Sequence, residues 1–155
     1  MDSPILKFYK AFADLDVEGM VACYADDVVF EDPAFGELKG ERAKNMWRML
    51  LDSQKGKDFR VTFKNDSIQG NTGTIQWEAF YTFTKTGRKV HNIIHAEMQF
   101  ENGLITHHKD DFNLRLWAKQ ALGFKGAILG GTKFFKKSLN QQTNLLLDKF
   151  ESKLS

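Results

Sequence analysis

The sequence predicts an α+β fold in which helices pack on one face of a curved antiparallel sheet. Apolar residues recur at helical spacing over roughly the first 51 residues, alternate with polar residues from Phe59, and return to helical spacing after about Thr132. This order of periodicities is typical of α+β proteins. With 155 residues, 42% of them apolar and 13% aromatic, the chain suits one compact domain with a substantial core.

Three helices are predicted in the N-terminal third. Ser3-Pro4 is a typical helix start, a hydroxyl cap before a proline, and an apolar stripe follows as far as about Asp16. Gly40 opens another helix that has Trp47 on its inner side. Between them Asp16 can cap a short helix, which we expect to carry Met20, Val21 and Tyr24.

Five strands are predicted, separated by recognisable turn sequences. The first, Val28 to Asp32, is a β-branched run closed by Pro33. Residues 85–88 and 101–103 are hairpin turns, the second containing an Asn-Gly pair. The other strands are a short one at Phe59-Val61-Phe63 and three long ones at Thr74 to Thr84, Lys89 to Phe100 and Leu104 to Leu114.

The C-terminal part departs from the strand pattern. Four glycines between Gly123 and Gly131 interrupt it, and a last helix is predicted from about Thr132. Three lysines of this helix lie beside Phe134 and Phe135, which is compatible with a membrane-surface helix. We expect instead a solvated basic face and no membrane contact, with the helix covering a cavity mouth or a partner subunit. The lysines are Lys133, Lys136 and Lys137.

Composition excludes several classes of protein. A net charge of +2 is too small for the broad electrostatic surface of a nucleic-acid binder. The lone Cys23 cannot form an internal disulfide, and the first residues lack the pattern of a signal peptide. No apolar run approaches the roughly 20 residues that span a bilayer. We therefore expect a cytoplasmic protein.

Two stretches carry a family resemblance. Residues 8–33 (FYKAFADLDVEGMVACYADDVVFEDP) resemble the opening of the ketosteroid isomerase and SnoaL-like branch of the nuclear transport factor 2 (NTF2) superfamily. Residues 87–123 resemble its last two long strands, most closely in uncharacterised bacterial members. The resemblance covers about residues 5–123 and leaves 124–155 as a helical extension of one domain. It implies a cone-shaped sheet around an apolar pocket, and a homodimer formed through the outer sheet surface.

Asp32 is the first candidate for chemistry. An acid before proline at a strand end often serves only as a turn former. By resemblance, Asp32 matches the catalytic base of the isomerases, and burial near Trp47 would raise its pKa into a useful range, as apolar surroundings do for carboxyl groups in those enzymes. The isomerases also use a tyrosine and a protonated aspartate as oxyanion donors, and Phe8 and Ala96 stand at those positions. A steroid isomerase is therefore disfavoured.

His108 and Asp110 form the second candidate group. Residues two apart on a strand share a face, so both side chains would point inward, together with Asn92 and Phe112. An imidazole beside a carboxylate can serve as an acid/base pair, or simply as a satisfied polar pair that anchors the strand. A bulge would reverse the register and turn a different set inward: His91, His95, Glu97, His107 and Asp111.

The remaining candidates concern the pocket wall and metals. The histidine spacing resembles no zinc site, so we expect neither a metal nor a cofactor. The epoxide-hydrolase branch of the superfamily uses an Asp-Arg-Asp set. Arg115 is predicted to lie on the outer face of its strand, so the sequence does not support that branch. The expected lining is Trp47, Trp77, Tyr24, Phe30, Tyr81 and Phe112.

Two functions remain open. The first is a small-molecule enzyme with cofactor-independent acid/base chemistry on an apolar carbonyl or polyketide-like substrate, using Asp32, His108 and Asp110. The second is a non-catalytic module that binds a small ligand or a protein.

Overall fold

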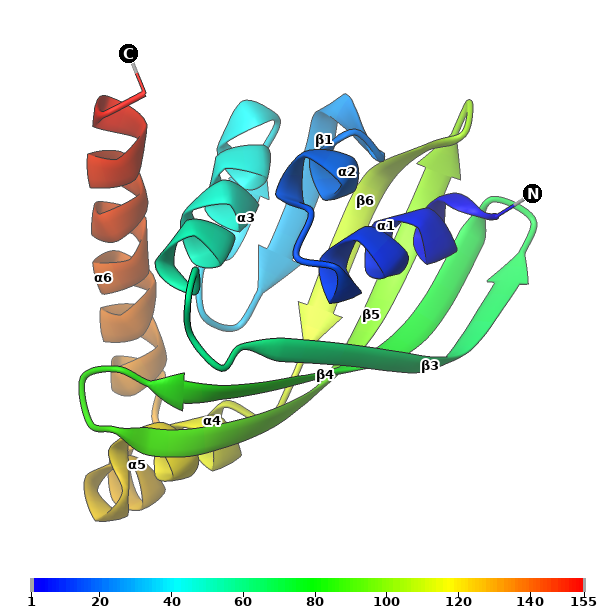
Figure 1. Cartoon of the computed structure of the whole chain (residues 1–155). Helices are drawn as coiled ribbons and strands as arrows, with labels where there is room; N and C mark the ends of the chain where they lie inside the picture. The colour runs from blue at the N-terminus through cyan, green and yellow to red at the C-terminus, as the bar shows by residue number, and fades with distance from the viewer. Residues whose placement is uncertain (1, 155) are drawn as a thin grey trace.

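The computed structural model describes residues 2–154 and contains one six-stranded sheet with six helices (Figure 1). The strands lie in the order β2-β1-β6-β5-β4-β3. They are β1 (Tyr24–Asp32), β2 (Gly36–Lys39), β3 (Arg60–Gln69), β4 (Thr72–Phe83), β5 (Arg88–Glu101) and β6 (Leu104–Asp111). The helices are α1 (Pro4–Ala13), α2 (Val17–Val21), α3 (Glu41–Ser53), α4 (Leu114–Leu122), α5 (Phe124–Leu129) and α6 (Lys133–Ser152).

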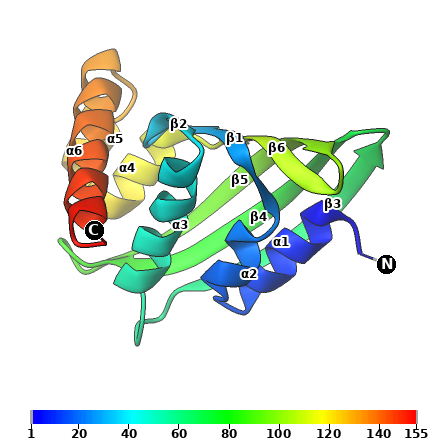
Figure 2. The same cartoon turned by 90° about the horizontal axis from the view of Figure 1, so that it is seen from above.

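The sheet is an antiparallel meander from β3 to β6, extended at one edge by β1 and β2. β1 runs parallel to β6 and forms a hairpin with β2, so the sheet is mixed and not purely antiparallel as predicted. The long strands β4 and β5 sweep beneath α1, α2 and α3 (Figures 1 and 2). α6 stands beside α3, while α4 and α5 close one end of the molecule.

α1 forms the centre of the core. The Ser3 hydroxyl accepts a hydrogen bond from the Leu6 amide, as the predicted cap requires. Phe8 and Phe12 of the apolar stripe are buried, with Phe8 stacked on Tyr24 and Phe12 packed edge-on against Trp47. These aromatic contacts fill the closed part of the curved sheet, and the open part lies further along toward α4 and α6.

Two further sequence predictions about elements are wrong, and one strand was not predicted. Tyr24 begins strand β1 and does not belong to the second helix. The last long strand ends at Asp111, because the Asn113 side chain accepts a hydrogen bond from the Leu116 amide and starts α4 at Leu114. The short strand β2 was not predicted.

The glycine-rich segment forms the helix α5 and packs closely on α4. A Cβ at Gly126 would lie 1.9 Å from the carbonyl oxygen of Ala118, and one at Gly130 would lie 2.7 Å from the Ala118 Cβ. These two glycines therefore permit a helix contact that any larger residue would block. No helix within residues 2–154 is long and apolar enough to cross a membrane.

Candidate functional site

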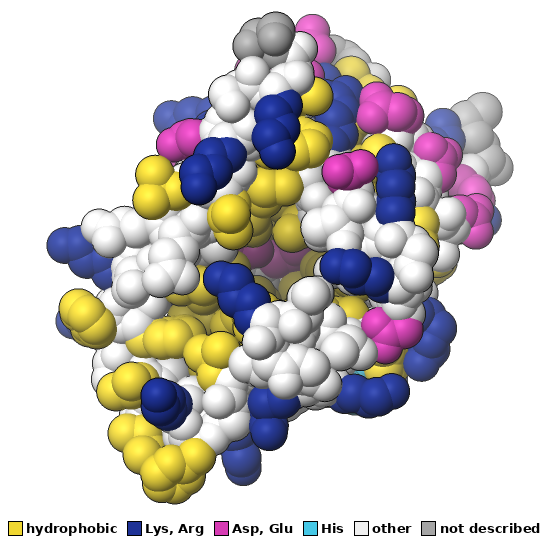
Figure 3. Space-filling view, turned by 60° about the vertical axis from the view of Figure 1, so that its left-hand side comes forward, with side chains coloured by type: hydrophobic (Ala, Val, Ile, Leu, Met, Phe, Trp, Pro, Cys, Tyr) yellow, Lys and Arg dark blue, Asp and Glu magenta, His cyan; other side chains and the backbone are white. Residues whose placement is uncertain are grey.

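A cavity of about 480 Å³ opens between the curved sheet and the helices α3, α4 and α6. Figure 3 shows the hollow with acidic side chains at its floor and hydrophobic side chains around it. Ten residues were predicted for the site or its lining, and seven of them line this cavity: Asp32, Trp47, Trp77, Tyr81, Asn92, Asp110 and Phe112. The other three, Tyr24, Phe30 and His108, do not line it, because they are buried in the core beside it.

The strand register answers the question of which residues face inward. Ala96 pairs with Asp110 and Met98 with His108, and all four residues are buried. The irregularity in the β5–β6 pairing falls between Gln99 and Phe100, beyond this region, so it does not reverse the faces. The residues of the alternative register are exposed: His91, His95, Glu97, His107 and Asp111.

Asp32 lies at the end of β1 and serves both as a turn former and as part of the cavity floor. Its Oδ1 accepts hydrogen bonds from the amides of Ala34 (2.9 Å) and Phe35 (2.7 Å). Within residues 2–154 no hydrogen bond reaches its second oxygen, Oδ2. Burial raises the pKa of the carboxyl to about 7; the Phe35 amide opposes this shift and the negative charge of Asp110 adds to it.

Asp110 is held by a chain of buried hydrogen bonds. The Trp47 indole donates to the Tyr24 hydroxyl (2.9 Å), which lies 2.7 Å from Nδ1 of His108. His108 Nε2 lies 2.8 Å from Oδ1 of Asp110, which also accepts from the Trp77 indole at 3.3 Å. These distances fit an arrangement in which Tyr24 donates to Nδ1 and Nε2–H donates to Asp110, while the Tyr9 hydroxyl lies 3.5 Å from the same Nε2. His108 therefore orients the carboxylate from behind.

The positions of Tyr24 and His108 correct the expectation that both face the pocket. The His108 ring is enclosed by Phe8, Phe30 and Trp47, with centroid separations of 5.5, 5.1 and 6.2 Å. His108 does point to the inner face of the sheet, but α1 covers that part of the face. Burial raises the pKa of the Tyr24 hydroxyl well above its usual range, so this group stays protonated as a hydrogen-bond donor.

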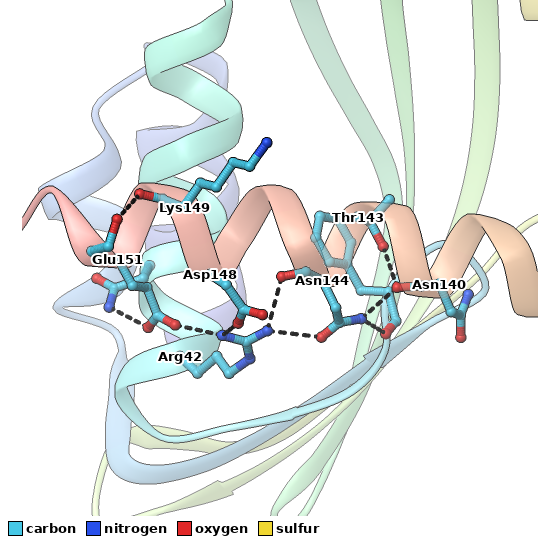
Figure 4. A network of polar contacts seen from close by, with 10 residues as sticks. Arg42, Asn140, Thr143, Asn144, Asp148, Lys149 and Glu151 are labelled. Atoms are coloured by element: carbon cyan, nitrogen blue, oxygen red, sulfur yellow. Dashed lines mark hydrogen bonds and ion pairs between the residues drawn. The ribbon is translucent and has the colours of Figure 1, made fainter.

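Three polar side chains of α6, here called the α6 seam, fix the loop that follows Asp32: Asn140, Thr143 and Asn144. The Asn140 side chain donates to the carbonyls of Pro33 and Ala34, both at 2.9 Å. Thr143 donates to the Ala34 carbonyl and Asn144 to that of Phe35. Figure 4 shows Asn140, Thr143 and Asn144 following one another along α6. The loop therefore presents its carbonyls to α6 and its amides to the Asp32 carboxylate.

The same helix is tied to α3 further along. The Arg42 guanidinium binds the carboxylates of Asp148 (2.8 Å) and Glu151 and the side-chain oxygen of Asn144 (2.9 Å). Asn45 donates to the second oxygen of Glu151 (Figure 4). These contacts keep α6 against the cavity, as a helix that closes one side of it.

Two further polar groups of the cavity were not predicted as such, although Tyr81 was expected in the lining. The Trp117 indole donates to the hydroxyl of Tyr81 at 2.7 Å, which leaves the phenol proton free to be donated. The Oε1 atom of Gln54 is buried in the wall without a hydrogen-bond partner among the described residues. Neither arrangement has a sequence signal, because each depends on how α3, α4 and β4 come together.

Charge and metal chemistry are limited at this site. Among the described residues that line the cavity there is no arginine, and Arg115 instead donates to the Ala127 carbonyl. Within residues 2–154 no three His, Cys, Asp or Glu side chains lie close enough to hold a metal ion. The polar side chains of the lining carry carboxyl, amide, hydroxyl and phenol groups, together with the ammonium group of Lys85.

The fold is that of NTF2-like proteins. The family model for the SnoaL-like domain matches residues 5–108, and the chain belongs to this family. No curated protein sequence matches the chain.

Solved structures share the fold at low sequence identity. A Catenulispora acidiphila protein with a ketosteroid isomerase-like fold, in complex with trimethylamine, has a TM-score of 0.62 and 14% identity over 76% of this chain and 91% of that one. An epoxide hydrolase from M. tuberculosis, described as LEH-like, has a TM-score of 0.59 and 21% identity over 82% and 88%. A putative polyketide cyclase from Xanthomonas campestris has a TM-score of 0.58 and 19% identity over 76% and 93%.

Proposed function

We propose that the protein is an enzyme that moves a proton on an apolar, carbonyl-containing small molecule without a cofactor. The observation that carries this proposal is the pair of carboxyl groups, Asp32 and Asp110, at the floor of an otherwise apolar cavity. A carboxyl group with a pKa of about 7 can accept a proton and return it near neutral pH.

The proposed mechanism gives each group one task. Oδ2 of Asp32 takes the proton from the carbon beside the carbonyl, and the electron pair moves onto the carbonyl oxygen. The Tyr81 hydroxyl donates a hydrogen bond to the enolate oxygen, supported by the Trp117 indole. Asp32 then returns the proton to another carbon of the same molecule. Alternatively, the enolate carbon attacks a second carbonyl and closes a ring, and the alkoxide formed from that carbonyl takes the proton back from Asp32.

Asp110 supports Asp32 in the proposed mechanism. The indole of Trp77 and the imidazole of His108 hold one of its oxygens, so its other oxygen has a fixed direction. Its negative charge raises the pKa of Asp32 and makes that group a stronger base. His108 is a positioning residue in this scheme, because it acts only through Asp110.

The cavity wall supports the choice of substrate class. Trp47, Trp77 and Phe112 offer aromatic surface, and a volume of about 480 Å³ suits a molecule of a few fused rings or an equivalent chain. Two proteins that share the fold are named as a polyketide cyclase and an epoxide hydrolase, and both names refer to small-molecule substrates. Hydrolysis of an epoxide is less favoured here, since no arginine lies among the described lining residues.

A non-catalytic ligand-binding module is the second candidate. The observation that favours it is the complete pairing of the Trp47–Tyr24–His108 chain, which a purely structural role would also explain. In that case the cavity would bind its ligand with little pH dependence near neutrality.

A ligand panel tests the proposal. Wild-type protein is melted with apolar ketones, 1,3-diketones, lactones, epoxides and steroids, and Asp32→Asn and Asp110→Asn are melted in parallel. A cavity ligand at about 100 times its Kd should raise the Tm by about 5–10 °C. The proposal expects a carbonyl compound to bind and to be turned over by wild type alone. A ligand that binds all three proteins equally and is never converted would establish the binding module.

A further inference from the structure

We propose that the end of the molecule formed by α5 and the first turn of α6 docks on the surface of an anionic lipid membrane. The proposal goes beyond the acid/base function and does not depend on it. The surface concerned, here called the end patch, consists of Phe124, Ile128, Leu129 and Phe134.

The apolar side chains of the end patch are unusually exposed. Phe124 and Phe134 are each 80% exposed, and Ile128 and Leu129 are 59% and 50% exposed. Hydrophobic side chains gather at the lower end of the molecule in Figure 3, with basic side chains among them. Such a group of large apolar residues on the surface usually marks a binding surface.

The packing of α5 explains why these residues point outward. The glycines at 126 and 130 form the face that touches α4, and a side chain at either would meet that helix. Phe124 and Ile128 lie on the opposite face of the same helix. The outward face of a helix in water is normally polar. In α5 the inward face instead carries glycines, and the outward face carries large apolar side chains.

The charge around the end patch indicates which kind of partner it binds. Residues 112–147 contain six lysines and arginines and no aspartate or glutamate, although the whole chain has a net charge of only +2. Lys125, Lys133, Lys136 and Lys137 are all exposed within or beside the end patch. The β4–β5 hairpin adds Arg88, whose guanidinium donates to the Gln120 carbonyl of α4.

An apolar centre with only basic neighbours matches an anionic lipid surface, where aromatic side chains enter the interface and lysines meet headgroups. A second copy of this chain fits poorly, because a two-fold contact through the end patch would bring the same four lysines together. The sequence alone favoured a solvated basic face for the last helix. The exposure of Phe124 and Phe134 changes that expectation.

The location would also serve the cavity. Phe135 and Leu139 of α6, which carries part of the end patch, also line the cavity, as do Trp117 and Leu122 of α4, on which α5 packs. A membrane contact here would bring the cavity close to the bilayer, from which an apolar ligand could enter without crossing water.

Vesicle flotation tests the proposal on the full chain. Wild-type protein is mixed with phosphatidylcholine vesicles, with and without about 30 mol% phosphatidylglycerol, at about 0.1 and about 0.5 M NaCl. We expect partition onto the anionic vesicles at least about tenfold above the neutral ones, and a large loss at high salt. Phe124→Ser/Phe134→Ser and Lys125→Gln/Lys133→Gln should each reduce it about tenfold.

Controls separate this surface from general stickiness and from misfolding. Ile68→Ser removes an apolar side chain that is 42% exposed on strand β3, outside the end patch, and it should leave partition unchanged. The surface variants should keep the wild-type Tm, and Asp32→Asn should partition like wild type whatever its effect on stability or activity. Equal partition of wild type and the Phe124/Phe134 variant would overturn the proposal. So would sedimentation velocity showing a lipid-free dimer that the same variant dissociates.

Discussion

The Asp32 carboxyl must be ionised to act as a base, yet its surroundings disfavour the charged form. In the unfolded chain its pKa is near 3.8, and in the folded protein it is about 7. Between these pH values the folded protein holds a proton that the unfolded chain has released. The contribution of Asp32 to the free energy of unfolding therefore falls as pH rises from about 4 to about 7. Over the same range the ionised fraction of its carboxyl group, which is the form that acts as a base, increases.

The first prediction follows because ionisation of Asp32 is needed for catalysis but lowers the stability of the folded protein. Asp32→Asn should abolish turnover and, at pH 8, raise the free energy of unfolding by on the order of 2 kcal/mol, because no charge is then buried. The gain should shrink toward zero near pH 4. Urea denaturation at several pH values measures it, with the exposed Asp27→Asn as the matched control. A variant that is less stable than wild type at pH 8 would contradict the account of this residue.

Tyr24 supplies the second prediction at this scale. Its hydroxyl joins the Trp47 indole to Nδ1 of His108, and both groups are buried. Tyr24→Phe leaves them unpaired, which should lower the free energy of unfolding by about 1–3 kcal/mol. Tyr81→Phe is the matched comparison, since it removes a hydroxyl bonded to a single indole near the cavity. Equal stability of Tyr24→Phe and wild type would show that the chain does not hold Asp110.

At the scale of elements, the α6 seam connects a helix to the chemistry of a loop 107 residues away in sequence. Asn140→Ala removes two hydrogen bonds to the loop carbonyls, so the Ala34 and Phe35 amides should be less well fixed on Asp32. The carboxylate then loses stabilisation, and the midpoint of the pH–rate profile should move upward by about half a unit or more.

The control for this change is Gln141→Ala, which alters an exposed position on the same helix. Its pH midpoint should equal that of wild type. A seam that is merely structural would lower the Tm of Asn140→Ala and leave the midpoint where it was, so the pH profile decides between the two roles.

The close contact of α5 with α4 gives the fourth prediction. Gly126→Ala would place a Cβ 1.9 Å from the Ala118 carbonyl oxygen, so the helices must separate and the variant should lose about 1–3 kcal/mol of stability. Gly131→Ala meets nothing nearer than 3.4 Å and is the control. Thermal unfolding measures both, and a Gly126→Ala variant as stable as its control would refute the packing described here.

Periodicity predicted most of these elements, because alternation and helical spacing are local properties of the chain. It also predicted that Asp110 and Asn92 share the inner face, since strand parity is fixed by counting residues. It could not show that α1 covers His108, because that depends on the aromatic packing of distant segments. The helix α4 was missed although Asn113 is a recognisable cap, since the alternating pattern before it was extended past that residue.

For the whole molecule, α4, α5 and α6 lie together at one side of the sheet (Figure 2). Residues of α4 and α6 line the cavity, α6 carries the seam, and α5 and α6 carry the end patch. Binding, chemistry and docking would then share the same helices. The homodimer implied by the family resemblance stays a prediction; sedimentation at increasing concentration measures it. We expect such a dimer to use the outer sheet face, where Ile93 and His95 are exposed, and to leave the end patch free.

The most direct test of the central claim is solvent exchange at the carbon beside a carbonyl, followed by proton NMR in D₂O. It requires only that a base in the cavity removes and returns a proton, so the true substrate need not be known. For any ketone or 1,3-diketone that binds, we predict that wild type accelerates loss of that proton signal at least about a hundredfold over Asp32→Asn, with a pH midpoint near 7. Exchange at equal rates with wild type, Asp32→Asn and buffer, for compounds that bind, would contradict the account.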